Sequence, residues 1–248
     1  MKIVVIGGHG RVGSKIVEQL DEHGHDAVAA DLSTGVNTLT REGLAEAFDG
    51  ADVVIDVSNS PSFEDAAVLE FFRTGTGNIL AAEKAAGVGH HVALSIVGAD
   101  RLPDSGYLRA KVAQEQLIQD ASIPYSIVRA TQFFEFVDAI ADAATEGDTV
   151  RLPTALIQPM AAVDVASAVC RIAVGTPANG IVEIGGPEPF RFDKLISYGL
   201  SVRNDPRHVV ADPDARYFGT TLTNGSLVPG ENAQLGQTRF EDWLATAS

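Results

Sequence analysis

A tyrosine and a lysine stand four positions apart in the segment SGYLRAKVAQE, residues 105–115. Residues at this spacing share one face of a helix, so Tyr107 and Lys111 are predicted to point the same way. A phenol with a pKa near ~10 is a poor acid–base catalyst at neutral pH, but a nearby cation stabilises the phenolate. The spacing therefore predicts a proton-transfer pair, with Tyr107 as the acid/base and Lys111 as the cation that assists it.

The alternative is a solvated helix that carries both residues by coincidence. With four tyrosines and five lysines among 248 residues, chance gives roughly 0.08 pairs at this spacing. A helix would also place Lys111 on the same flank as Ala110 and Ala113, with Glu115 on the other side. A solubilising lysine does not belong on a small, apolar flank, which favours the catalytic interpretation.

A third group should polarise the substrate carbonyl. Ser95, in VALSIVGAD, is the candidate because it lies at the carboxyl end of the strand that precedes the Tyr107 helix.

The segment VIGGHGRVGSKI places Gly7, Gly10 and Gly13 between an apolar strand and a helix. Glycines allow a tight turn and the close approach of a pyrophosphate, and the helix N-terminus supplies free amides and a positive dipole end. The acid Asp31 ends the second strand, as a dinucleotide-binding unit requires. We predict that the turn, with Arg11 and Val12 inside it, binds NAD(P), and that the ammonium of Lys111 holds the nicotinamide ribose. The alternative is a structural turn without a ligand.

Short apolar strands alternate with helical patterns along the first 150 residues. The predicted strands are 2–7, 26–31, 51–58, 90–98 and 124–130. Apolar strands separated by helices indicate a parallel sheet covered on both faces, and right-handed crossovers make it a doubly wound, Rossmann-like α/β fold. We predict a single domain, 1–248, in which residues from about 150 form a small C-terminal cap over the substrate side. Ser58 follows the third strand and is predicted to border the cofactor.

Composition narrows the function classes. A net charge of −15 argues against nucleic-acid binding. No apolar run approaches the ~18 residues that span a bilayer, and the single cysteine, Cys170, suits a reducing compartment, so a cytoplasmic protein without a membrane partner is expected. His90–His91 is interpreted as a strand-start loop rather than as a metal site, because no further ligand recurs at suitable spacing. The sequence is compatible with a homo-oligomer.

These motifs together resemble the short-chain dehydrogenase/reductase superfamily. The segments PYSIVRATQFFEF, AAVDVASAV and GIVEIGGPE are similar to its atypical, NmrA-like branch. The resemblance implies Gly7, Gly10 and Gly13 on the pyrophosphate, Asp31 on the adenine ribose, and the roles given above for Tyr107, Lys111 and Ser95. The chain departs from many members at Ile96 and Val97, where they carry further serines.

The predicted function is NAD(P)-dependent oxidoreduction of a carbonyl/alcohol pair in a small, fairly apolar substrate. Phe133 and Phe136 would form an apolar wall with Gln132 as a polar tip, although aromatic residues at helical spacing are usually core. The alternatives are a non-catalytic NmrA-like redox sensor, disfavoured by the Tyr107–Lys111 pair, and an epimerase or isomerase that retains its NAD. Asp31 would repel a 2′-phosphate whereas the Arg11 guanidinium could reach one, and the balance favours NAD over NADP.

Overall fold

The centre of the molecule is a seven-stranded parallel sheet. A computed structural model describes residues 1–246, and its strand order is β12-β9-β5-β4-β3-β1-β2, with every neighbouring pair parallel. The strands are β1 (Lys2–Ile6), β2 (Asp26–Ala30), β3 (Val53–Asp56), β4 (His90–Ile96), β5 (Tyr125–Ala130), β9 (Gly180–Gly185) and β12 (Gln234–Leu235). The predicted doubly wound parallel sheet is confirmed.

The order of the strands reverses at β1. The chain leaves β1 for β2 on one side and then crosses to β3 on the other side. In open α/β sheets, ligands bind outside the carboxyl ends of the strands at such a switch point. The turn after β1 and the loop after β3 are therefore the segments that the topology brings to the binding position.

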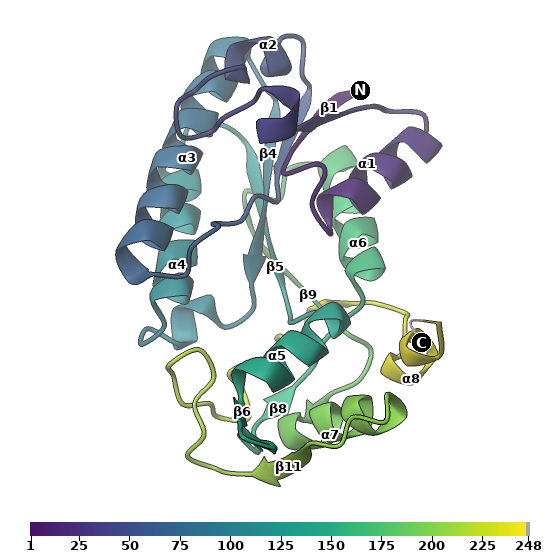
Figure 1. Ribbon diagram of the computed structural model, residues 1–248. Coiled ribbons are helices and arrows are strands. Elements are labelled where there is room, and N and C mark those ends of the chain that lie inside the picture. The colour runs from purple at the N-terminus through teal and green to yellow at the C-terminus, as the bar shows by residue number, and fades with distance from the viewer. Residues whose placement is uncertain (247–248) are drawn as a thin grey trace.

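Helices cover both faces of this sheet, as Figure 1 shows. One face carries α1 (Gly13–Glu22) and α6 (Ala162–Val174), and the other carries α2 (Leu44–Phe48), α3 (Asp65–Ala86) and α4 (Gly106–Asp120). The strands are apolar on both sides: Ile3 and Val5 pack toward α1 and α6, while Val4 and Ile6 pack toward α2 and α3. This double burial explains why the strands show continuous apolar runs rather than alternation.

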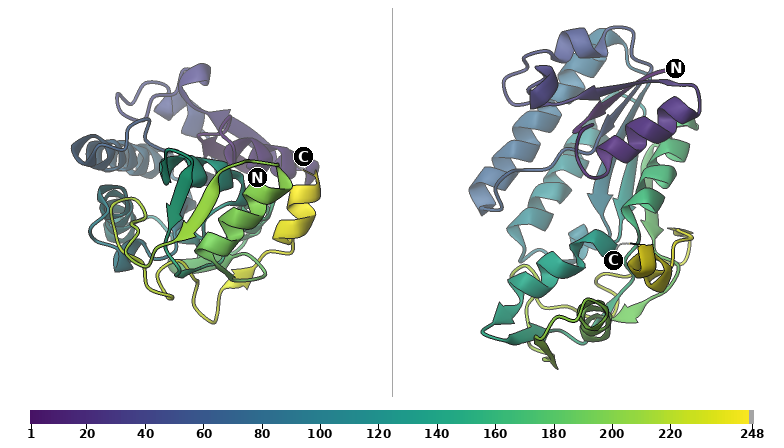
Figure 2. Two further views of the ribbon diagram at one scale, coloured as in Figure 1. Left: turned by 60° about the horizontal axis from the view of Figure 1, so that its bottom comes forward. Right: turned by 45° about the vertical axis from the view of Figure 1, so that its right-hand side comes forward.

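A smaller part of the chain lies beyond the carboxyl ends of the strands (Figures 1 and 2). It contains α5 (Val137–Ala143), β6 (Thr145–Glu146), β7 (Thr149–Leu152), β8 (Leu156–Ile157), β10 (Phe190–Arg191), α7 (Phe192–Val202), β11 (His208–Ala211) and α8 (Phe240–Thr246). Its own core is built on the buried rings of Phe134, Phe192 and Phe240. This part begins before residue 150, at α5, and the later elements α6, β9 and β12 pack with the main sheet.

Candidate functional site

The glycine turn after β1 is closed by contacts that only glycine permits. Gly7 has φ +79°, and a Cβ on Gly13 would lie 2.1 Å from the carbonyl oxygen of Gly7. The amide of Gly10 donates to that same oxygen at 2.9 Å. Sequence reasoning missed Gly8, whose Cβ would lie 2.6 Å from Cα of Ala29. The turn is thus packed tightly against β2, with no room for a side chain on its inner side.

The helix that follows this turn begins without a side-chain cap. Val12 is the N-cap residue of α1, and no side chain within residues 1–246 caps the first amides of the helix, although the amide of Ser14 donates to the carbonyl oxygen of Gly10 at 3.0 Å. Amides of this kind, together with the positive end of the helix dipole, suit an anionic group. The bare turn and the uncapped helix therefore fit the pyrophosphate of a dinucleotide.

Asp31, directly after β2, reaches across to the glycine turn. Its Oδ2 accepts hydrogen bonds from the amide of His9 at 3.1 Å and from His9 Nδ1 at 2.7 Å. Its Oδ1 accepts from the amide and the hydroxyl of Ser33, at 2.9 and 2.6 Å. Although burial alone raises the pKa of this carboxyl group, these hydrogen bonds lower it to about 2. Asp31 is therefore an anion that faces the turn.

Arg11 also extends from the turn, but toward the smaller part of the chain. Its guanidinium carbon lies 5.3 Å from the centre of the Phe136 ring. Phe136 in turn stacks on Phe133, with ring centres 5.5 Å apart. The three side chains connect the predicted cofactor turn to the predicted substrate wall.

Ser58, after β3, opens a buried polar chain that ends at Lys111. Ser58 donates through its amide and its hydroxyl to Asp56 Oδ1, at 3.0 and 2.6 Å. Gln114 donates to Asp56 Oδ2 at 3.0 Å and accepts a hydrogen bond from the Lys111 ammonium. The ammonium also donates to the carbonyl oxygen of Leu94 at 2.8 Å. Burial lowers the pKa of Lys111 to about 8, against the opposing charges of Asp56 and Glu115.

Tyr107 stands at the first turn of α4 with its hydroxyl against the loop after β3. The hydroxyl donates to Asn59 Oδ1 at 3.0 Å. The rings of Phe63 and Phe72 lie 5.4 and 6.2 Å from its ring. Burial raises the pKa of Tyr107 to about 12, and the hydrogen bond to Asn59 opposes this rise. The phenol thus holds its proton at neutral pH.

The structure does not show the direct effect of the Lys111 ammonium on the Tyr107 phenol that the sequence suggested. The two residues share the inner side of α4, but the ring of Phe72 lies against both: the ammonium is 4.3 Å from its centre. Burial, and not a neighbouring cation, dominates the pKa of the phenol. The sequence-based expectation that Lys111 lowers the pKa of Tyr107 is therefore wrong for this arrangement.

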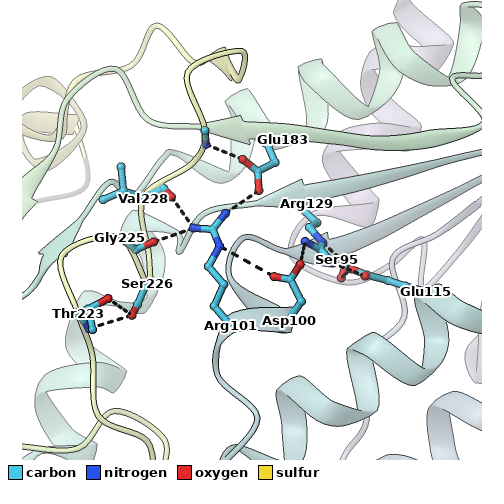
Figure 3. Close-up of polar contacts among 11 residues, drawn as sticks. Ser95, Asp100, Arg101, Glu115, Arg129, Glu183, Thr223, Gly225, Ser226 and Val228 are labelled. Carbon is cyan, nitrogen blue, oxygen red and sulfur yellow. Dashed lines mark hydrogen bonds and ion pairs between the residues drawn. The ribbon is translucent and has the colours of Figure 1, made fainter.

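Ser95 belongs to a buried ion-pair cluster rather than to an open surface. Figure 3 shows its hydroxyl pointing to Glu115, at 2.6 Å from Oε1. Arg129 binds the same carboxylate through two nitrogens, at 2.9 and 2.6 Å, and reaches Asp100 at 2.8 Å. Ser95 and Glu115 are each 3% exposed. This geometry gives Ser95 the role of anchoring α4 to β4, and it does not support the predicted hydrogen bond to a substrate carbonyl.

The same cluster continues to the C-terminal segment through Arg101. The Arg101 guanidinium donates to the carbonyl oxygens of Gly225 and Val228, at 2.7 and 3.2 Å, and to Glu183 on β9 at 3.3 Å (Figure 3). Glu183 also accepts from the amide of Gly230 at 2.6 Å. Residues 225–230 are thereby fixed against the carboxyl edge of the sheet.

The predicted substrate residues follow β5. Gln132 is 9% exposed, and its buried Oε1 has no hydrogen-bond partner among residues 1–246. Phe136 is 41% exposed, whereas Phe134, which lies between Phe133 and Phe136 in the sequence, is fully buried in the core of the smaller part. The aromatic run therefore divides into three environments. Phe134 is a core residue, Phe133 is half-buried and packs against the core of the main sheet, and the exposed Phe136 lies beside Arg11.

His90 and His91 are not a loop, as the sequence suggested, but the first residues of β4. His91 is fully buried, and its Nδ1 lies 2.7 Å from Glu83 Oε1. Among residues 1–246, no group of three or more histidine, cysteine, aspartate or glutamate side chains is arranged to hold a metal ion. In the same part of the chain, no helix is both long and apolar enough to cross a membrane.

The chain matches the family described as NAD(P)H-binding over residues 7–173, which is more than half of its length, and it belongs to that family. The match begins at the first glycine of the turn and includes Asp31, Tyr107 and Lys111. The predicted resemblance is thereby confirmed at the level of a dinucleotide-binding family.

Among curated proteins, the chain is similar to the photosystem II assembly factor Ycf39 of a Synechocystis strain, with 27% identity over 149 residues. The alignment covers 54% of this chain and 46% of the relative. The chain thus spans about half the length of the curated relatives that it matches.

Solved structures share the fold over nearly the whole chain. A Thermotoga maritima UDP-glucose 4-epimerase has a TM-score of 0.78 at 18% identity and covers 98% of this chain and 96% of its own. A short-chain dehydrogenase/reductase superfamily protein from Agrobacterium tumefaciens with bound NAD has a TM-score of 0.76 at 18% identity, covering 100% and 96%. An NADPH-dependent quinone oxidoreductase from Escherichia coli has a TM-score of 0.71 at 16% identity, and the alignment covers 99% of each chain.

Proposed function

We propose that the protein is an NAD(P)-dependent reductase that uses Tyr107 as the proton donor to a substrate carbonyl. The observation that carries this proposal is the placement of the Tyr107 hydroxyl: it donates to Asn59 on the loop after β3, at the sheet edge where the strand order reverses. The nicotinamide of a bound cofactor would supply the hydride.

The cofactor seat would be formed by Gly7, Gly10, Arg11, Val12 and Gly13, with Ser58 at its border. A tight glycine turn that packs against its own backbone and β2, followed by a helix without a side-chain cap, fits a pyrophosphate. Asp31 would accept hydrogen bonds from the ribose hydroxyls of the adenosine half. Because this carboxylate would repel a 2′-phosphate, we favour NAD as the cofactor.

The phenol of Tyr107 is in its acid form at neutral pH, because its pKa is raised to about 12. A pKa this far above neutral makes the phenol a weak acid, so proton donation would require the bound substrate and cofactor to stabilise the phenolate as negative charge develops on the carbonyl oxygen. Asn59 would orient the hydroxyl. Lys111, through Leu94 and Gln114, would position α4 and the strand end beneath the site.

The substrate is proposed to be a fairly apolar carbonyl compound. Phe133 and Phe136 would supply a flat apolar wall, and the unpartnered Oε1 of Gln132 would accept a hydrogen bond from a polar group of the substrate or the nicotinamide. The quinone oxidoreductase with the same fold acts on substrates of this general kind.

Replacing the phenol tests the proposal. We expect Tyr107→Phe to lower turnover at least 100-fold in a screen of aldehydes, ketones and quinones followed by loss of reduced-cofactor absorbance, because general acid catalysis contributes on the order of 10²–10⁴. The dissociation constant for NADH should stay within about threefold, since a single neutral hydroxyl is lost on the substrate side. Tyr198→Phe, at a half-exposed position on α7, is the matched control. Unchanged turnover in Tyr107→Phe contradicts the proposal.

The second candidate is a dinucleotide-binding sensor that performs no chemistry. It is favoured by one observation: the polar atoms of Lys111 and Ser95 are both engaged inside the protein, at Leu94 and Glu115. This function predicts tight binding of NADH, discrimination between reduced and oxidised cofactor, and no consumption with any carbonyl in the screen. An epimerase that retains its NAD is a weaker third candidate and predicts cofactor that co-purifies with the protein.

A further inference from the structure

The carboxylate of Asp31 already has as many hydrogen-bond donors as it can accept. Two reach Oδ1, both from Ser33, and two reach Oδ2, both from His9. An ionised carboxylate offers about four lone-pair positions. A ribose that donates two hydroxyls to Asp31 must therefore replace two of the four donors.

Two of these donors are fixed by the backbone. The His9 amide lies in the glycine turn between Gly8, which packs against β2, and Gly10, whose own amide is bound to Gly7. The Ser33 amide lies in a short 3₁₀ helix, Leu32–Thr34, in which Asp31 is the N-cap and Thr34 binds back to the Asp31 backbone. Neither amide can leave Asp31 without opening its turn.

The other two donors are side chains that can rotate away. The His9 imidazole is 58% exposed, and Ser33 is exposed as well. When either side chain rotates away, it loses its contact with Asp31. The 3.4 Å contact between the Ser33 hydroxyl and His9 Nδ1 is lost as well. Two movable donors thus occupy the positions that two vicinal hydroxyls would need.

We propose that the His9 imidazole and the Ser33 hydroxyl are exchangeable substitutes for the two ribose hydroxyls, so that these side chains set the affinity and the choice of cofactor at Asp31. This inference rests on the proposed role of Asp31 as the ribose acceptor. When a ribose with two free hydroxyls binds, Asp31 loses the two side-chain donors of His9 and Ser33 and gains the two hydroxyl donors of the ribose. A ribose with a 2′-phosphate brings acceptors in place of one donor, and it gains nothing when His9 and Ser33 leave Asp31.

The direct test is to measure cofactor binding after each movable donor is removed. We expect His9→Ala and Ser33→Ala each to tighten NADH binding about three- to tenfold by isothermal titration calorimetry, because one net hydrogen bond no longer has to be broken. NADPH binding should not tighten in either variant. His23→Ala, at an exposed histidine beyond the far end of α1, is the matched control. Urea unfolding without cofactor verifies that each variant is folded.

Asp31→Asn, alone and combined with His9→Ala, tests separately whether Asp31 binds the ribose and whether the side chains exchange with it. If Asp31→Asn leaves NADH binding unchanged, Asp31 is not the ribose acceptor and the cofactor part of the proposed function fails. If Asp31→Asn weakens binding while His9→Ala and Ser33→Ala leave NADH binding unchanged or weaken it, the exchange itself is overturned. Weaker NADPH binding in His9→Ala would assign the imidazole to a 2′-phosphate and would likewise overturn it. Support requires that the gain from His9→Ala disappears in the Asp31→Asn background.

Discussion

The ammonium of Lys111 donates to the carbonyl oxygen of Leu94, 2.8 Å away, while the hydroxyl of Tyr107, one turn earlier on the same helix, donates to Asn59. Tyr107 and Lys111 thus have different partners: Lys111 bonds inside the protein, and Tyr107 bonds to the loop after β3. Lys111 fixes α4 to the end of β4, together with the bond from Ser95 to Glu115. Tyr107 is left at the loop after β3, where its hydroxyl is the proton donor that we propose.

The burial of Lys111 has a consequence for stability against pH. Its pKa falls from 10.5 to about 8 on folding, so the unfolded chain binds one more proton between these values and the free energy of unfolding rises with pH across that window. From pH 7 to pH 9.5 this group should contribute a gain of about 2 kcal/mol. Lys111→Met should remove the gain, as measured by urea unfolding at both pH values.

Lys84→Met serves as the control, because Lys84 is exposed near the end of α3 and its removal should leave the pH slope unchanged. Equal slopes in the wild type and in Lys111→Met would show that the ammonium is not held in the buried position described above. Comparing differences between variants also cancels the opposing effect of Tyr107, whose raised pKa lowers stability only above about pH 10.

The Ser95→Ala variant tests whether Ser95 holds α4 against β4 or binds the substrate carbonyl. Removing a hydrogen bond to a charged group should cost about 1.5–3 kcal/mol of stability, while Glu115 keeps its two bonds to Arg129. We expect kcat and the dissociation constant for NADH to change less than about threefold, since the hydroxyl points into the protein. A drop of kcat by about 100-fold without loss of stability would return Ser95 to the carbonyl-binding role that the sequence suggested.

Gly13→Ala should open the glycine turn. A Cβ there would lie 2.1 Å from the carbonyl oxygen of Gly7, a contact that requires backbone movement and should cost more than about 2 kcal/mol of stability. NADH binding should weaken at least tenfold because the turn that faces the pyrophosphate is displaced. Gly77→Ala in α3, where a Cβ meets nothing within 4 Å, should instead stabilise the protein by up to about 1 kcal/mol. Equal behaviour of the two variants in thermal unfolding and calorimetry would contradict this account of the turn.

The fold could be predicted from the sequence because its signals are local. Apolar strands bounded by helices define a parallel sheet, and the five predicted strands in residues 1–130 all occur, with ends that differ by no more than two residues. Gly7 and Gly13 were recognisable because their spacing and their place after a strand reflect backbone geometry. Gly8 was not, because its requirement comes from Ala29 on another strand.

The side-chain partners could not be predicted because, like the contact of Gly8 with Ala29, they join segments that are distant in the sequence. Glu115 was placed on the solvent side of its helix, yet it is buried because Arg129 on β5 and Ser95 on β4 meet it there. Asn59 gave no signal as a partner of Tyr107, since the loop after β3 has no periodicity. Contacts between segments that are distant in the chain decide which polar group is free to do chemistry, and helical spacing alone does not contain them.

The choice between NADH and NADPH can be tested at Asp31 and Arg11, the two charged residues to which the sequence gives opposite preferences. Two like charges a few ångströms apart cost on the order of 1–4 kcal/mol, so Asp31 should give NADH at least a tenfold lower dissociation constant than NADPH. The Arg11 guanidinium lies over the Phe136 ring, on the side of the turn toward the smaller part of the chain, where it cannot offset that repulsion without leaving the ring. Arg11→Ala should therefore keep the preference for NADH within about threefold, with Arg73→Ala, at an exposed position on α3, as the control. A preference for NADPH in the wild type that collapses in Arg11→Ala would show that the arginine, and not the carboxylate, reads the 2′ position.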